Sequence, residues 1–149
     1  MSNKKRFSHR RISPILSLLM DRFNHDEIRG AQETVTTALL NRTLSAIISG
    51  FPPRIYAIER PDGVWDLLSG QAFLSAVYQY FTDQVAAPTT SDEHLSAFHG
   101  KRFSELHASD KRTLLNTAVE LFYCDAPHKD DVQAMAFRAA IRDSQLLNQ

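Results

Sequence analysis

The sequence predicts an α+β fold in which a β-hairpin is surrounded by several helices. Two observations carry the hairpin: residues 54–59 alternate in the manner of a strand, and residues 60–63 (RPDG) supply turn chemistry before a second apolar run at 64–68. A third observation carries the helices, because apolar side chains recur at helical spacing over residues 34–49 and 71–81.

Length and composition limit what the chain can be. It has 149 residues, 43% hydrophobic and 23% charged, which suits a single globular domain. The formal net charge is zero, so there is no global attraction to polyanions, although a local patch is compatible with it. No apolar run reaches the ~18 residues of a membrane span, and residues 12–20 lack a signal cleavage site, so we expect a cytoplasmic protein.

The N-terminus is the one strongly basic segment. We predict that residues 1–11 form a flexible arm and that residues 12–149 form the domain. The arm carries five cations and no acid: Lys4, Lys5, Arg6, Arg10 and Arg11. Clustered cations release counterions from nucleic acid, so the arm is either a solvated tail or a phosphate-gripping element.

The first two helices are predicted from caps and periodicity. Ser13 as N-cap and Pro14 at the first helical position predict a helix that runs to about Phe23. Residues 25–30 are polar and indicate a connection. The second helix, over residues 34–49, should end at Gly50, where a C-terminal glycine belongs.

Gly70 should break the second hairpin strand and lead into the helix over residues 71–81. Trp65, in the middle of that strand, is expected in the core or at an interface. Beyond it we predict a loop at 83–91, a short helix at 92–98, a strand-to-turn segment at 101–106 and a helix entry at 109–112. Residues 117–124 favour a strand over a helix, and residues 129–147 predict a last helix.

The histidines, aspartates and single cysteine of the sequence give little support for a metal site or a reactive thiol. The six histidines are scattered without zinc spacing, so no metal site is expected. Asp125, Asp130 and Asp131 are read as charges that complement a helix N-terminus, with a magnesium site as the alternative. The single cysteine, Cys124, excludes an intrachain disulfide, and its apolar neighbours predict a buried thiol.

Residues 67–75, LLSGQAFLS, carry a resemblance to a known signature. They resemble the N-terminal domain of GmrSD-type restriction proteins, in the ParB/sulfiredoxin-like superfamily, where this frame reads hydrophobic-hydrophobic-Asp-Gly-Gln-Gln-Arg-Leu-Thr. Gly70 and Gln71 match, whereas Ser69 and Phe73 replace the Asp and the Arg. Residues 44–52 (LSAIISGFP) and 100–106 (GKRFSEL) match further blocks of the family. The resemblance implies a small ParB-like core.

The resemblance also implies where a ligand would bind. In the family, the glycine turn leads into a helix N-terminus whose amides hold phosphate, and the Asp and Arg supply metal and phosphate contacts. Ser69, Gly70 and Gln71 are therefore candidate cofactor-binding residues. Arg54 joins them because Arg54 and Arg60 bracket the first hairpin strand, and we expect both to face the same groove as Gly70. Arg60, at the other end of that strand, is a candidate nucleic-acid contact. The alternatives are a purely structural turn and solvated strand-end charges.

Three functional hypotheses follow. The first is a non-catalytic, ParB-like interaction domain that acts on nucleic acid or on a nucleic-acid-processing partner, by analogy a small phage-type or defence-related regulator. The second is a nucleotide-binding enzyme with an atypical site, using a nucleoside triphosphate with magnesium. The third is a structural or oligomerisation module, and a homo-oligomer is compatible with the zero net charge. The absence of the family's Asp and Arg favours the first hypothesis, the interaction domain. On that hypothesis we expect no catalytic residues and no required cofactor.

Overall fold

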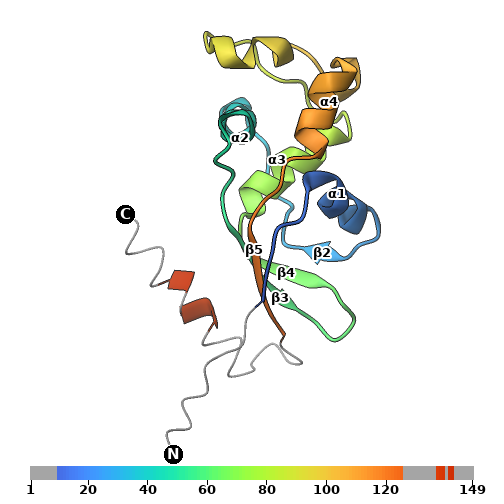
Figure 1. Cartoon of the computed structure of the whole chain (residues 1–149), viewed down its shortest axis with the longest axis vertical. Helices are drawn as coiled ribbons and strands as arrows, with labels where there is room; N and C mark the ends of the chain where they lie inside the picture. The colour runs from blue at the N-terminus through green and yellow to red at the C-terminus, as the bar shows by residue number, and fades with distance from the viewer. Residues whose placement is uncertain (1–9, 126–136, 140, 143–149) are drawn as a thin grey trace, which may run out of the picture.

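A computed structural model describes residues 10–125, 137–139 and 141–142 of the chain (Figure 1). Within these residues the strands form one mixed, five-stranded sheet in the order β1-β5-β3-β4-β2. The strands are β1 (Arg10–Ile12), β2 (Ile28–Arg29), β3 (Ile55–Glu59), β4 (Trp65–Ser69) and β5 (Leu121–Asp125). The helices are α1 (Leu16–Asn24), α2 (Thr37–Ser49), α3 (Gln71–Phe81) and α4 (Ala108–Leu115), with 3-10 turns at Glu93–Phe98 and Phe103–Glu105. The α+β class predicted from the sequence is therefore confirmed.

The predicted hairpin is present as β3 and β4, which pair antiparallel. The turn closes through a hydrogen bond from the Gly63 N–H to the Arg60 carbonyl at 2.9 Å. Asp62 supports it, since its carboxylate accepts from the Val64 N–H at 3.0 Å. Strand β5 lies parallel to β3 on the other side, so the strand favoured for residues 117–124 is confirmed from Leu121 onward.

The two periodic helices follow the sequence prediction closely. Helix α2 begins three residues later than expected, where the Thr36 hydroxyl caps it by accepting from the Leu39 N–H at 3.1 Å. It ends at Gly50, whose φ of 80° is the left-handed conformation predicted for a glycine stop. Helix α3 has the predicted bounds of residues 71–81.

The predicted start of the first helix is wrong. Helix α1 begins at Leu16, and the chain before it is drawn into the sheet instead. Pro14 accepts a hydrogen bond from the Val119 N–H at 3.0 Å, and Ile15 forms an antiparallel bridge with Ala118. Strand pairing thus holds Ser13 and Pro14 in extended backbone, which overrides their local preference for a helix start.

Other differences concern short elements. Arg10 and Arg11 lie in strand β1 and not in a flexible arm, because β1 pairs antiparallel with β5. The connection predicted at 25–30 contains β2, which pairs parallel with β4. The 101–106 segment forms a 3-10 turn and no strand. The helix predicted at 129–147 lies mostly outside the described residues. Within that range, the structure describes residues 137–139 and 141–142, and these are helical.

The sheet has two covered faces. Ile55, Ala57, Trp65 and Leu67 pack with the helices in the main core, where Trp65 is 5% exposed, as a core position predicts. The opposite side, hereafter the outer face, carries Ile58 and Cys124, which pack against Phe137 and Ile141.

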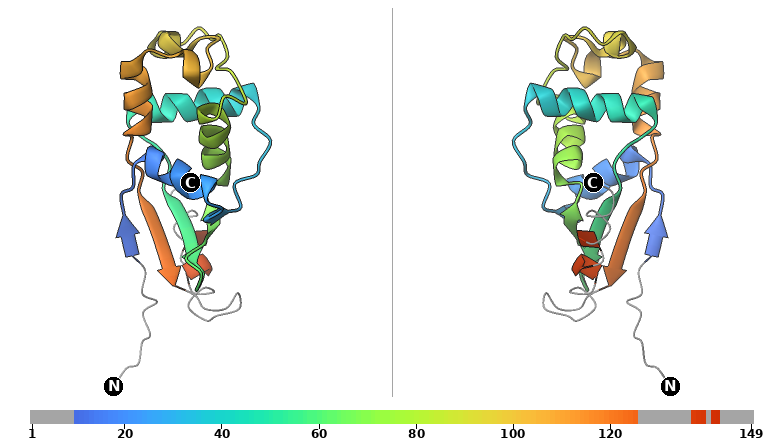
Figure 2. Two further views of the ribbon diagram at one scale, coloured as in Figure 1. Left: turned by 90° about the vertical axis from the view of Figure 1, so that its right-hand side faces the viewer. Right: turned by 90° about the vertical axis from the view of Figure 1, so that its left-hand side faces the viewer.

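Figure 1 shows α1 and these C-terminal helical residues on opposite sides of the strands, and Figure 2 shows α2 and α3 beyond one end of the sheet. Among the described residues, no helix combines the length and the apolar character that crossing a bilayer requires.

Candidate functional site

The signature turn joins β4 to α3 through Gly70. Its φ is 82°, in the left-handed region that disfavours side chains. A β-carbon at this position would lie 2.9 Å from Cγ1 of Ile55, which is fully buried in the neighbouring strand β3. Gly70 is thus required both by its backbone conformation and by the close approach of Ile55. This explains why the glycine is present here without invoking a ligand.

The side chains around Gly70 serve the fold. The Ser69 hydroxyl accepts a hydrogen bond from the Tyr56 N–H at 3.2 Å, beside the register shift in β3. The Gln71 amide donates to the Leu67 carbonyl at 3.3 Å. Phe73 is 6% exposed and belongs to the main core. The residues that replace the family's Asp and Arg therefore have structural roles, as a hydrogen-bond acceptor and as a core side chain.

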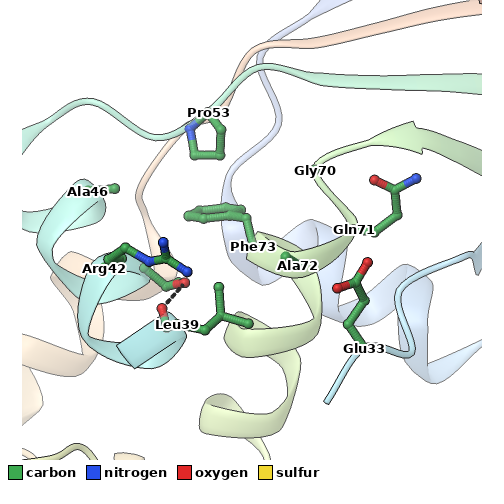
Figure 3. A pocket seen from close by; sticks show the side chains of 10 residues that line it. Glu33, Leu39, Arg42, Ala46, Pro53, Gly70, Gln71, Ala72 and Phe73 are labelled. Carbon is green, nitrogen blue, oxygen red and sulfur yellow. Dashed lines mark hydrogen bonds between the residues drawn. The ribbon is translucent and has the colours of Figure 1, made fainter. Parts of the chain in front are cut away.

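An open groove with a volume of about 380 Å³ lies beside this turn (Figure 3). One wall is helix α2 and the other is the first turn of α3, with Pro53 at one end, and we call it the α2–α3 groove. It is lined by Glu33, Leu39, Arg42, Thr43, Ala46, Pro53, Gly70, Gln71, Ala72 and Phe73. Most of these side chains are apolar, so the groove suits an apolar group better than a polyphosphate.

Arg42 and Glu33 are the charged residues of the groove, and Figure 3 shows them on opposite sides of it. Both are exposed. Neither side chain forms an ion pair among the described residues. Glu33 lies beside the first turn of α3, where its carboxylate already supplies the negative charge that a helix N-terminus favours. A phosphate at that position would meet this carboxylate as well as the backbone amides.

Neither Arg42 nor Glu33 is among the site residues predicted from the sequence. Arg42 is the single charged residue between positions 34 and 53, within an otherwise apolar and uncharged helix pattern. This isolated charge in an apolar helix is the sequence feature that could have marked Arg42 as a site residue. No comparable sequence feature marks Glu33, because its position beside α3 depends on the path of the chain between β2 and α2. The link is a hydrogen bond from the Glu33 N–H to the hydroxyl of Ser75 at 3.1 Å.

The expectation that Arg54 faces the same groove as Gly70 is wrong, and Arg60 does not line the groove either. Arg54 forms an ion pair with Glu120 at 3.1 Å, and Arg11 pairs with the same carboxylate at 2.7 Å. Arg60 pairs with Asp66 across the hairpin. The neighbouring strand positions carry side chains of the main core, so these pairs belong to the outer face.

Arg11, Arg54 and Arg60 are thus brought together on one side of the sheet. Arg11 lies 6.0 Å from the centroid of the Phe122 ring, which packs on the outer face. Among the described residues, the ion pairs of these three guanidinium groups involve only two carboxylates, those of Glu120 and Asp66. The outer face therefore has an excess of positive charge among the described residues, although the net charge of the whole chain is zero.

The remaining predicted cations are placed differently. Arg10 is one strand position from Arg11 and points the other way. A hydrogen bond with Tyr123 raises the pKa of the Arg10 guanidinium, with further support from Asp125. Lys4, Lys5 and Arg6 lie outside the described residues, as do Asp130 and Asp131. Within the described part of the chain, no group of three or more potential metal ligands is assembled.

A scan against protein-family models, a search of the curated proteins and a search of the solved structures each found no match.

Proposed function

We propose that this chain is a cytoplasmic, non-catalytic interaction domain of ParB-like type that acts on nucleic acid or on a nucleic-acid-processing partner. One observation carries the non-catalytic part. At the turn where the resemblance implies phosphate chemistry, Ser69 is bonded to the backbone of Tyr56 and Phe73 is buried. Neither position presents a group that could hold a metal or clamp a phosphate, and the adjoining groove is mainly apolar.

The cations of the outer face support nucleic acid as the ligand. Arg11 and Arg54 share Glu120, so one of them can turn to a phosphate while the carboxylate keeps a partner. Exposed ion pairs of this kind are worth little in water, so exchanging one for a phosphate contact costs little. In the sequence, three further basic residues stand at positions 4–6, ahead of β1.

Fluorescence anisotropy with short labelled single- and double-stranded DNA tests the proposal. The double variant Arg11→Gln/Arg54→Gln should weaken binding. The magnitude of the slope of log K against log salt should fall by roughly 0.9, the contribution of the one phosphate contact that the pair makes while Glu120 keeps a partner. Arg112→Gln is the matched control, because Arg112 is an exposed cation on α4, away from the outer face. Equal losses in both variants would contradict an interface on the outer face.

A thermal-shift screen with magnesium and nucleoside triphosphates tests the alternative of an enzyme. A ligand at 100 times its dissociation constant adds about 2.7 kcal/mol of stability. We expect no such shift. A shift that is lost in Arg42→Gln would place a nucleotide in the α2–α3 groove and would favour the nucleotide-binding enzyme over the non-catalytic domain. If neither DNA nor nucleotide binds, a protein partner becomes the favoured hypothesis, and a pull-down tests it.

A further inference from the structure

Phe51 is displayed on the surface in an unusual way. Its side chain is 81% exposed, while Leu18, the other large apolar residue exposed in the described part of the chain, is 57% exposed. The backbone around Phe51 is held on both sides. Its N–H donates to the Ala46 carbonyl at 2.9 Å, and Pro52 follows directly. An aromatic ring on a pre-organised backbone loses little entropy when it docks, so Phe51 is suited to be an interface anchor.

The α2–α3 groove lies next to Phe51, since Pro53 forms one end of it. Its apolar lining includes Leu39, Ala46 and Phe73, and its volume of about 380 Å³ is large enough to receive an aromatic side chain. One chain therefore carries both an exposed aromatic ring and an apolar groove.

The charges of the two features are complementary. Arg42 on the groove wall is placed to meet the face of an incoming ring, which attracts a guanidinium group. Glu33, on the opposite side of the groove, is matched by Arg54, which follows Phe51 by three residues. Arg54 is available because Glu120 keeps Arg11 when Arg54 turns away. The segment from Phe51 to Arg54 thus offers a ring for the apolar lining of the groove and a cation for Glu33.

We propose that a second copy of this chain occupies the groove, with Phe51 of each copy inserted into the α2–α3 groove of the other. A two-fold arrangement satisfies both features at once, because each copy supplies one ring and one groove. The zero net charge imposes no overall repulsion between copies. The inference shares Arg54 with the proposed function, but Phe51 and the α2–α3 groove are not part of the outer face. Phe51→Ser and Ala46→Lys therefore test the pairing without removing a proposed phosphate contact.

Sedimentation equilibrium over a wide range of protein concentration tests the pairing. The full-length chain should show a monomer–dimer equilibrium. Phe51→Ser removes the ring, and Ala46→Lys places a charged chain in the groove. Each should shift the equilibrium to monomer, and Arg42→Ala, at an exposed position, should weaken it. Leu18→Ser is the matched control, because it removes an exposed apolar side chain elsewhere and should leave the dimer intact. Circular dichroism checks that each variant is folded.

Mixing the variants separates a second copy from any other occupant. Phe51→Ser keeps its groove and Ala46→Lys keeps its ring, so an equimolar mixture restores one of the two contacts. Native mass spectrometry should then show the mixed dimer, while each variant alone gives monomer. A wild-type chain that stays monomeric throughout, a dimer that survives either substitution, or a mixture that forms no mixed dimer would overturn the inference.

Discussion

Glu59 and Asp125 are opposite each other at the last register pair of the parallel strands β3 and β5. Partial burial raises the pKa of the Glu59 carboxyl group, and a hydrogen bond with Asp125 raises it further. Arg22 is close enough to oppose this shift in part. The neighbouring acid therefore adds to burial in favouring the protonated form of Glu59.

The raised pKa of Glu59 predicts how stability changes with pH. Between the ordinary value near 4.5 and the higher folded value, the folded protein binds more protons than the unfolded chain. The contribution of Glu59 is therefore fully present below this window and is lost as the pH rises through it. Urea unfolding at a series of pH values should show this decrease in the wild type.

Glu59→Gln is the control for that measurement, because it cannot titrate and keeps the shape of the side chain. The decrease across this pH window should then be smaller than in the wild type. A wild-type and a Glu59→Gln profile of equal slope in the window would contradict the assignment.

Gly70 and Gly63 form a matched pair for measuring the close approach of Ile55. Both have positive φ, 82° and 86°, but a β-carbon at Gly63 meets nothing within 4 Å. Gly63→Ala should cost about 1–2 kcal/mol of unfolding free energy from backbone strain alone. Gly70→Ala adds overpacking against Ile55 and should cost roughly 1–3 kcal/mol more. Urea denaturation measures the free energy of unfolding of both variants. Equal losses would show that the Ile55 side chain moves aside for the new methyl group without an energetic penalty.

Ser69→Ala tests whether the Ser69 hydroxyl serves the fold. It removes the acceptor of the Tyr56 N–H and should lower the free energy of unfolding by about 1 kcal/mol. Ser69→Thr keeps a hydroxyl at the same place and should retain most of this stability. If Ser69→Ala is as stable as the wild type, the hydrogen bond contributes nothing and the position is open to another role.

Cys124 reports on how the outer face is covered. It is fully buried and packs in one cluster with Phe137 and Ile141. We expect slow modification by a thiol reagent under native conditions and a faster rate in Ile141→Ala, because that substitution opens the cover above the thiol. Leu18→Ala, at an exposed position on α1, should leave the rate unchanged. An unchanged rate in Ile141→Ala would mean that Cys124 is protected by the sheet alone.

The sequence predicts best where a local signal has one structural solution. Gly50 and Gly70 mark the end of α2 and the start of α3 because glycine is needed for positive φ at both places. Strands β1 and β2 were missed because three and two residues cannot display a period. The helix start predicted at Ser13 and Pro14 was wrong, because pairing with the segment before β5 overrides the local preference of these residues for a helix N-terminus.

The site was harder to predict than the fold. Gly70 was found by its motif, but its neighbours in space were not. Arg54 is expected there because it brackets the first hairpin strand, whereas the arginine that lines the groove, Arg42, comes from the face of α2 that borders α3. Which arginine reaches the groove depends on how two helices pack, and no periodicity within either helix encodes that.

The position of β5 sets the order in which this sheet can assemble. It lies between β1 and β3, so the N-terminal strand has no partner until residues 121–125 are available. During synthesis, β3 and β4 can pair early through their short turn, but β1 can join the sheet only after residues 121–125 have left the ribosome. Such distant pairing slows folding, and a ribosome-stalled chain that ends before Leu121 should expose β1 and one edge of β3 to chaperones.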